Sequence, residues 1–221
     1  MSKQIIIGLT AEGTTDIRFL ESVIQRSFEN MAFECSGQVE VLPVQYIKKE
    51  SGAFVDTVIK YARHAQAQGI MALCIHADAD DSTDTDTFNY KINPAFVTVE
   101  KIREPPVCKN LVAVVPVQMT EAWMLSDKEL LKAEIGTEKS DIELGLDRLP
   151  EAYDNPKHAI ESAIRIGQNF HRRRRHKLTI SEPYAPIGQK IGLNTLERLP
   201  SYQKFKEAVR GAFINLNYLQ E

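Results

Sequence analysis

The sequence predicts an α/β protein with a mainly parallel, four-stranded sheet that is flanked by helices and followed by a helical C-terminal extension. Short apolar runs alternate with segments of helical periodicity over the first half of the chain. Connections of helix length between successive strands are typical of parallel sheets with right-handed crossovers. No further apolar run suited to a strand follows the fourth one, so the rest of the chain is expected to be helical.

The first two strands enclose a capped helix. The first strand is predicted over residues 5–9, an apolar run that ends in a polar, glycine-containing turn. Thr14 or Thr15 can cap the helix that follows, because a hydroxyl at that position accepts a hydrogen bond from an unpaired amide of the first turn. The second strand is predicted over residues 39–47, and Pro43 favours an edge position because proline has no N–H to donate.

The same alternation continues through the next part of the chain. Helical periodicity spans residues 53–66, and Gly69 ends it before a third strand at residues 70–75. An acidic loop, a short helix near residues 96–102 and a valine-rich fourth strand at residues 111–117 follow. The carboxyl ends of these strands should meet at one edge of the sheet.

The second half of the chain carries helical patterns without a strand. Helices are predicted in four segments, residues 121–125, 128–134, 156–169 and 201–213. We therefore predict an α/β domain over residues 1–127 and a helical extension over residues 128–221 that packs on it.

Composition limits the classes of protein that fit. The chain has 221 residues, enough for a normal hydrophobic core, and a formal net charge of -3, which gives no overall attraction to nucleic acid. Cys35, Cys74 and Cys108 are odd in number and lack CxxC spacing, which argues against a disulfide framework or a thiolate zinc site. No run resembles a signal peptide or a membrane span, so we expect a cytoplasmic protein without a membrane partner.

Three acidic residues follow the ends of two predicted strands. Glu12 comes after the first strand, and Asp78 and Asp80 come after the third. Ligands of parallel α/β sheets bind beyond the carboxyl ends of the strands, and residues two apart in an extended segment point the same way. Carboxylates without nearby cysteine or clustered histidine favour Mg²⁺ or Mn²⁺ as the ion. A solvated acidic turn remains the alternative interpretation.

Other candidates each have a structural alternative. His76 adjoins the DxD and could orient a phosphate or a water, or be structural, and Glu121 opens a predicted helix, where the helix dipole alone could explain an acid. A basic run could supply phosphate contacts to nucleic acid, or be solvated surface, compensate the acidic loop, or bind an acidic partner. This run consists of Arg172, Arg173, Arg174, Arg175 and Lys177.

Three motifs carry a resemblance to a known family. AEGTTDIRFLESVI after the first strand, HADADD after the third and VPVQMTEAWMLSD after the fourth resemble the Toprim fold. The chain is most similar to uncharacterised Toprim-like proteins of bacterial defence islands, some encoded beside an ATPase of the overcoming-lysogenization-defect type. The resemblance covers residues 1 to about 127, with weaker matches at IGQKIGL and LPSYQKF.

The resemblance implies a metal-dependent nuclease. Glu12 would be the catalytic acid or base or a metal-linked carboxylate, Asp78 and Asp80 the ligands of Mg²⁺ or Mn²⁺, and Glu121 a further site residue. The substrate would be nucleic acid, with DNA expected, and the setting antiviral defence beside a partner ATPase. Strand passage is not expected, since no tyrosine lies in a helix-turn-helix setting, and a primase would need a longer chain.

Two other function classes stay open. A non-catalytic Toprim-like regulatory or binding subunit would keep the fold without the chemistry. A nucleotide-sugar transferase also uses a DxD after a hydrophobic strand to bind a metal diphosphate, although it has no need of Glu12. The sequence specifies neither the number of metal ions nor the oligomeric state.

Overall fold

Parallel strands form the centre of the molecule. The computed structural model describes residues 3–168 and 178–220, and the statements below concern these residues. The strands are β1 (Lys3–Ile5), β2 (Ile7–Thr10), β3 (Val39–Val41), β4 (Gln45–Tyr46), β5 (Ala72–His76) and β6 (Leu111–Val114). One sheet has the order β4-β2-β5-β6, β1 pairs with β3, and every pairing is parallel. The predicted α/β class with a mainly parallel sheet is confirmed.

Two prolines shape the outer strands. The segment predicted as one strand over residues 39–47 is divided into β3 and β4 on either side of Pro43, and β4 lies at the edge as expected. The fourth strand was predicted to reach residue 117 but ends at Val114. The backbone beyond it still accepts hydrogen bonds, since the Ala79 N–H donates to the Pro116 oxygen at 3.1 Å. Pro116 has no backbone N–H to donate to the neighbouring strand, so the regular hydrogen-bond pattern of the sheet ends before it.

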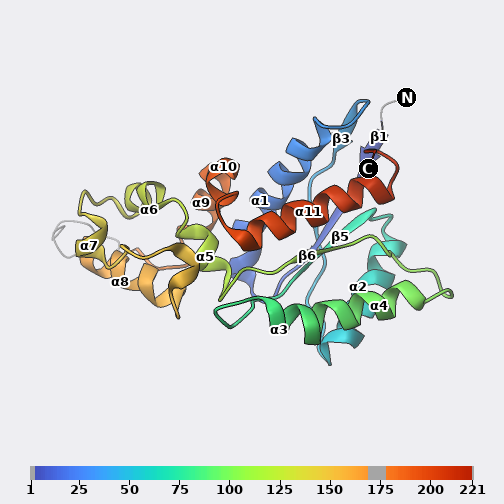
Figure 1. Cartoon of the computed structure of the whole chain (residues 1–221), viewed down its shortest axis with the longest axis horizontal. Coiled ribbons are helices and arrows are strands. Elements are labelled where there is room, and N and C mark those ends of the chain that lie inside the picture. The colour runs from blue at the N-terminus through green and yellow to red at the C-terminus, as the bar shows by residue number, and fades with distance from the viewer. Residues whose placement is uncertain (1–2, 169–177, 221) are drawn as a thin grey trace.

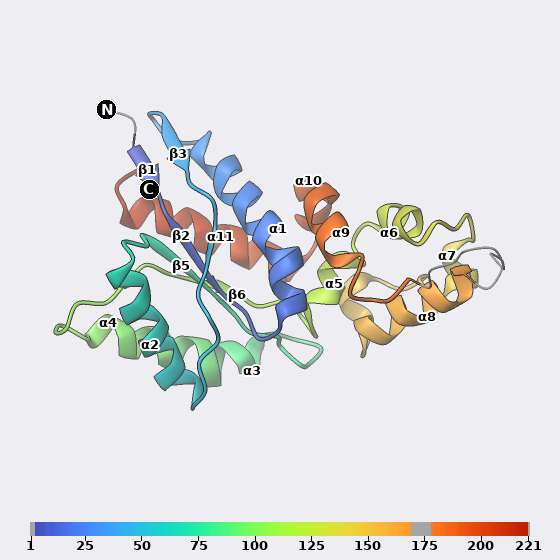
Figure 2. The same cartoon turned by 180° about the vertical axis from the view of Figure 1, so that it is seen from behind.

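Helices cover both faces of the sheet (Figures 1 and 2). Helices α1 (Thr14–Ala32) and α11 (Pro200–Asn215) lie on one face, and α2 (Phe54–Ala67) and α4 (Asn93–Lys101) on the other. The short helix α3 (Thr85–Thr87) and a π-helical turn, η1 (Phe88–Ile92), lead into α4, which begins earlier than predicted. Alternate residues of β5 enter two separate cores, as the two-residue period of a strand requires.

The remaining helices gather at one end of the molecule, beyond the sheet (Figure 1). They are α5 (Thr120–Met124), α6 (Lys128–Ile135), α7 (Asp141–Leu144), the 3₁₀ turn η2 (Pro150–Ala152), α8 (Pro156–Gln168), α9 (Tyr184–Lys190) and α10 (Leu193–Leu196). The four helices predicted after residue 120 are present as α5, α6, α8 and α11, whereas α7, α9 and α10 were not predicted.

The chain returns from this end to the sheet through α11. The Asn110 side-chain amide, just before β6, donates to the Ala212 carbonyl of α11 at 3.1 Å. The last helix therefore covers the same face as α1 (Figure 2). Within the described residues, no helix is both long enough and apolar enough to cross a membrane.

Candidate acidic metal centre at the carboxyl edge of the sheet

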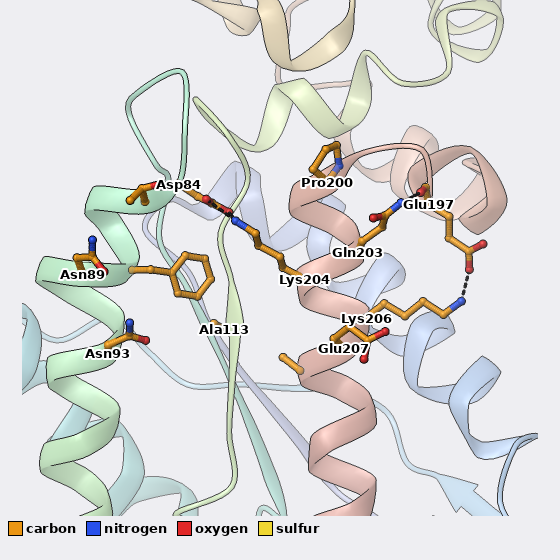
Figure 3. A pocket seen from close by; sticks show the side chains of 13 residues that line it. Asp84, Asn89, Asn93, Ala113, Glu197, Pro200, Gln203, Lys204, Lys206 and Glu207 are labelled. Carbon is orange, nitrogen blue, oxygen red and sulfur yellow. Dashed lines mark hydrogen bonds and ion pairs between the residues drawn. The ribbon is translucent and has the colours of Figure 1, made fainter. Parts of the chain in front are cut away.

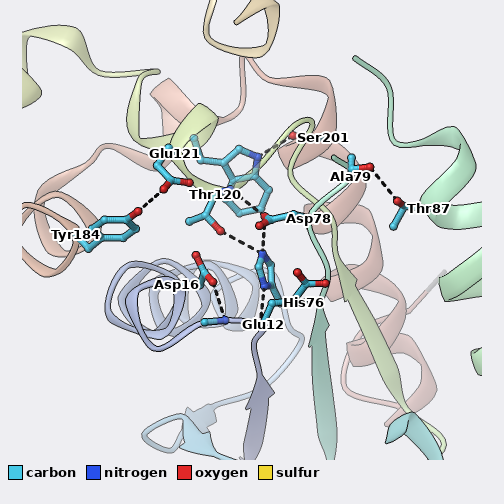
Figure 4. A network of polar contacts seen from close by, with 12 residues as sticks. Glu12, Asp16, His76, Asp78, Ala79, Thr87, Thr120, Glu121, Tyr184 and Ser201 are labelled. Atoms are coloured by element: carbon cyan, nitrogen blue, oxygen red, sulfur yellow. Dashed lines mark hydrogen bonds and ion pairs between the residues drawn. The ribbon is translucent and has the colours of Figure 1, made fainter. Parts of the chain in front are cut away.

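Residues that follow three neighbouring strands meet at the carboxyl edge of the sheet (Figure 4). Glu12 follows β2, Asp78 follows β5, and Thr120 opens α5 after β6. Strand β5 lies between β2 and β6, so its end stands between the other two. This order places the Asp78 side chain between Glu12 and the start of α5.

His76, the last residue of β5, connects these segments. It is 3% exposed. Its Nδ1 accepts from the Glu12 N–H at 3.4 Å, and its Nε2 lies 3.2 Å from Asp78 Oδ1 and 3.1 Å from Thr120 Oγ1. The Thr120 N–H donates to the same Asp78 oxygen at 3.0 Å. The imidazole therefore fixes the positions of Glu12 and Asp78 relative to each other.

The charges of the acidic residues act on one another. Burial and the negative charge of Asp78 raise the pKa of Glu12, and the charge of Asp80 adds to this, against the opposing effect of Lys91 and His76. Burial alone would lower the pKa of His76, but the hydrogen bond and charge of Asp78, helped by other acids, raise it overall. A cation placed among these carboxylates would relieve their repulsion.

The DxD turn differs from the extended segment that the sequence suggested. Asp80 has a φ of 54°, in the left-handed region, so it does not simply alternate with Asp78. Its N–H donates to the Gln118 carbonyl at 2.8 Å, and the Gln118 N–H donates back to the Asp81 carbonyl at 3.0 Å. This pair of hydrogen bonds to the segment after β6 holds Asp80 in the unusual conformation.

The carboxylate oxygens at this edge are of the type that hard divalent cations prefer. Across the described residues, no hydrogen bond or ion pair engages the carboxylate of Glu12 or Asp80, and Asp78 uses only Oδ1. Residues 3–168 and 178–220 contain no group of three or more His, Cys, Asp or Glu side chains already arranged as metal ligands. Mg²⁺ keeps several waters and needs only one or two protein carboxylates, so the available oxygens suit Mg²⁺ or Mn²⁺.

Two further acids, Asp16 and Glu121, lie beside the first set (Figure 4). Asp16, in the first turn of α1, accepts from the Gly13 N–H at 2.9 Å, and burial with the charge of Asp78 raises its pKa. Glu121 is 4% exposed and accepts a hydrogen bond from the Tyr184 hydroxyl of α9. Burial raises the pKa of Glu121, and the charges of Asp16 and Asp78 contribute.

Sequence reasoning did not identify Asp16 or Tyr184 as site residues. Asp16 had been interpreted only as a favourable acid in a first helical turn, and its spacing from Gly13 was the available signal. Tyr184 is 63 positions from Glu121, in a helix that was not predicted, so no local pattern pointed to it.

A further acid of the loop is held away from this centre. Asp84, in the same acidic loop as Asp80, is buried and pairs with Lys204 of α11 at 2.6 Å across a groove of about 910 Å³ (Figure 3). The basic run at Arg172, Arg173, Arg174, Arg175 and Lys177 lies outside the described residues. The acidic loop is therefore divided, with Asp78 and Asp80 near Glu12 and Asp84 bound to a helix of the tail.

Comparison with known proteins adds no relative. No protein-family model, no curated protein and no solved structure matches this chain.

Proposed function

We propose that this chain is a Toprim-like, Mg²⁺-dependent nuclease with Glu12, Asp78 and Asp80 as its metal-site residues. The observation that carries the proposal is the position of Glu12 and Asp78 on neighbouring strand ends, bridged by His76 and close enough for their charges, with that of Asp80, to raise the pKa of Glu12. The motifs after the first, third and fourth predicted strands supply the Toprim assignment.

Each residue of the proposed site has its own role in the hydrolysis of the phosphodiester bond. A bound Mg²⁺ would supply Lewis-acid stabilisation of the charge on the phosphate. Glu12, whose raised pKa suits proton transfer, accepts the proton from the attacking water as its oxygen bonds to phosphorus and the opposite P–O bond breaks. The leaving oxygen takes a proton from solvent. His76 and Thr120 hold Asp78 in place and act as positioning residues, and Glu121 adds negative charge behind them.

The setting follows from the resemblance. DNA is the proposed substrate, the cytoplasm the proposed compartment, and defence against phage beside a partner ATPase the proposed pathway. The basic residues Arg172 to Arg175 and Lys177 would add phosphate contacts from outside the described part of the chain.

Plasmid cleavage with isosteric variants tests the proposal. Wild-type protein should cut plasmid DNA with Mg²⁺ or Mn²⁺ but not with EDTA. Glu12→Gln and Asp80→Asn should each lower the rate roughly 10²-fold or more, the usual loss for a general base or a metal ligand. The control Asp86→Asn removes an exposed acid of the short helix α3, just after the loop, and should leave the rate unchanged. Equal cleavage by all three variants would mean that another protein or another site is responsible.

A non-catalytic subunit is the second candidate. Such a subunit would keep the fold and the contacts of His76 with Asp78 and Thr120 without the chemistry. Calorimetric titration with Mn²⁺ distinguishes the two, because the nuclease should bind the ion and Asp78→Asn should weaken that binding. A chain that binds no Mn²⁺ while retaining a protein partner is a binding subunit.

A further inference from the structure

A small cavity adjoins the acidic centre on the face of the sheet that α2 covers. Its volume is about 270 Å³, and it is lined by the end of β2, by the loop between β4 and α2, and by the first turns of α2. Glu12 and His76 belong to its wall as well as to the acidic centre. Pockets for drug-sized ligands start at about 300 Å³, so this cavity suits a small polar group better than a nucleoside.

Two residues that line the cavity, Thr10 and Tyr61, are nearly buried and carry hydroxyl groups that can donate a hydrogen bond. Thr10, the last residue of β2, is 3% exposed, and within the described part of the chain its hydroxyl has no hydrogen-bond partner. Tyr61 is 8% exposed, and its oxygen accepts from the Glu50 N–H at 2.9 Å while its own proton has no protein acceptor among the described residues. Both hydroxyl protons are therefore free to donate to a group that enters the cavity.

Helix α2 begins at the wall of the cavity, and its first turn has unpaired backbone donors. Ala53 caps this helix of 14 residues without a side-chain hydrogen bond, and Phe54 lines the cavity. Within residues 3–168 and 178–220, the N–H groups of Phe54, Val55 and Asp56 have no protein acceptor. Unpaired amides and the positive end of the helix dipole favour an anion at such a position.

Lys49 supplies a full positive charge. It lines the cavity, and its Nζ donates to the Glu12 carbonyl oxygen at 2.7 Å, so it reaches across to the acidic centre. Glu50 also lines the cavity, but its carboxylate is about half exposed and faces Lys60 at 3.9 Å. The wall beside Glu12 thus combines an ammonium group, two hydroxyl donors and free amides.

We propose that this cavity is a phosphate-binding subsite. It would hold a phosphate group of the nucleic acid next to the one that is cleaved, so its role in cleavage rests on the proposed nuclease function, whereas phosphate binding as such does not. Thr10 and Tyr61 would donate through their hydroxyls, Lys49 through its ammonium group, and the first turn of α2 through its amides. Occupancy would orient the strand with the adjacent phosphodiester toward Glu12.

Calorimetric titration with inorganic phosphate in EDTA tests the subsite without requiring catalysis. Wild-type protein should bind phosphate saturably. Lys49→Gln, Thr10→Val and Tyr61→Phe should each weaken binding, by roughly tenfold for the lysine, because hydrogen bonds to a charged group are among the stronger ones. Lys48→Gln is the matched control. Lys48 is the neighbour of Lys49 in the sequence and carries the same charge, but it does not line the cavity. Thermal unfolding confirms that each variant is folded.

Three results would overturn the subsite. They are an absence of saturable phosphate binding by the wild-type protein, an equal weakening by Lys48→Gln and Lys49→Gln, and wild-type affinity in both hydroxyl variants. The last two would identify general electrostatic attraction in place of a built site.

Cleavage of 5′-phosphorylated and 5′-hydroxyl oligonucleotides then separates the two sources of the phosphate. A terminal phosphate in the cavity gives a lower KM for the phosphorylated strand, which Lys49→Gln abolishes. An internal phosphate gives equal KM values, and Lys49→Gln raises both. If Lys49→Gln cleaves both oligonucleotides with the same KM as the wild-type protein, the subsite has no role in cleavage. If the wild-type protein cuts neither strand, the nuclease proposal fails, while the phosphate titration still decides the subsite.

Discussion

The carboxyl edge of the sheet and the interface of α1 with α5 and α11 both bury polar side chains, but the two regions differ in how these side chains are paired. At the helical interface the Trp123 indole N–H donates to the Ser201 hydroxyl at 2.7 Å. The hydroxyls of Ser27 and Tyr202 lie 2.8 Å apart in the same region. Both of these hydrogen bonds join neutral groups, and Ser201 in turn donates to the Glu151 carboxylate at 2.5 Å, so each buried polar group has a hydrogen-bond partner.

At the carboxyl edge the acids are not compensated in this way. Burial and mutual repulsion raise the pKa values of Glu12, Asp16 and Glu121, which means that their ionised forms are disfavoured where they stand. Perturbed titratable groups gathered in this way are typical of functional sites. We infer that the polar pairs of the helical interface stabilise the fold. The acids of the sheet edge lower the stability of the folded protein, and they place negative charge near an open surface.

Removing a core aromatic from the helical interface should produce the largest effect on stability. Phe205 is 1% exposed, and its ring centroid lies 5.9 Å from that of Trp123 and 5.7 Å from that of Tyr202. Phe205→Ala should lower the free energy of unfolding by about 3–5 kcal/mol in urea titrations, because it opens a cavity. Phe33→Ala is the control, since Phe33 is 88% exposed and its loss should change stability by about 0.5 kcal/mol or less. Similar losses for both would show that this interface is loosely packed.

A smaller loss is expected where α9 touches α1. A Cβ atom added at Gly188 would lie 2.6 Å from the backbone oxygen of Phe19, which cannot move without shifting α1. Gly188→Ala should therefore destabilise the protein by about 1–3 kcal/mol. Gly211→Ala, in α11, meets no atom within 4 Å and should be neutral or stabilising by up to about 1 kcal/mol, because alanine favours helices. Thermal unfolding compares the two, and an equal response would contradict the close packing of α9.

The fold could be predicted largely from the sequence because its signals are local. The period of the apolar residues marked β2, β5, α1 and α2, and Pro43 marked the edge strand correctly. The helices that were not predicted, α7, α9 and α10, have seven residues or fewer. Such short segments have little intrinsic helicity, and contacts with distant parts of the chain determine them.

The arrangement of the candidate site could be predicted only in part. Glu12 and Asp78 were identifiable because each follows a strand end, and parallel topology brings such ends together. The left-handed conformation of Asp80 depends on hydrogen bonds to Gln118, on a different strand end, so the local pattern could not reveal it. Tyr184 reaches Glu121 only through the packing of α9. The raised pKa values are likewise products of burial, which a sequence pattern does not specify.

The smallest expected effect concerns the charge at Asp16 and has the opposite sign. Because the pKa of Asp16 is raised above its ordinary value of 3.8, the folded protein holds more protons than the unfolded chain between the two pKa values. The free energy of unfolding therefore falls as pH rises through that window, and the loss is complete above the folded pKa. Asp16→Asn keeps an oxygen for the Gly13 N–H and removes the charge, so it should stabilise the metal-free protein at pH 8 by up to about 1 kcal/mol.

Asp56→Asn provides the contrast that makes this result interpretable. Asp56 also lies in a first helical turn, that of α2, but it is exposed, so its charge should interact favourably with the helix dipole. Asp56→Asn should therefore lower stability at pH 8 by about 0.3–1 kcal/mol, while Asp16→Asn raises it and loses its advantage below pH 3.8, the ordinary pKa of the group. Urea titrations across this pH range in EDTA measure both. If Asp16→Asn is destabilising to the same extent as Asp56→Asn, the dipole outweighs burial and repulsion, and the sheet edge is not under the electrostatic strain inferred here.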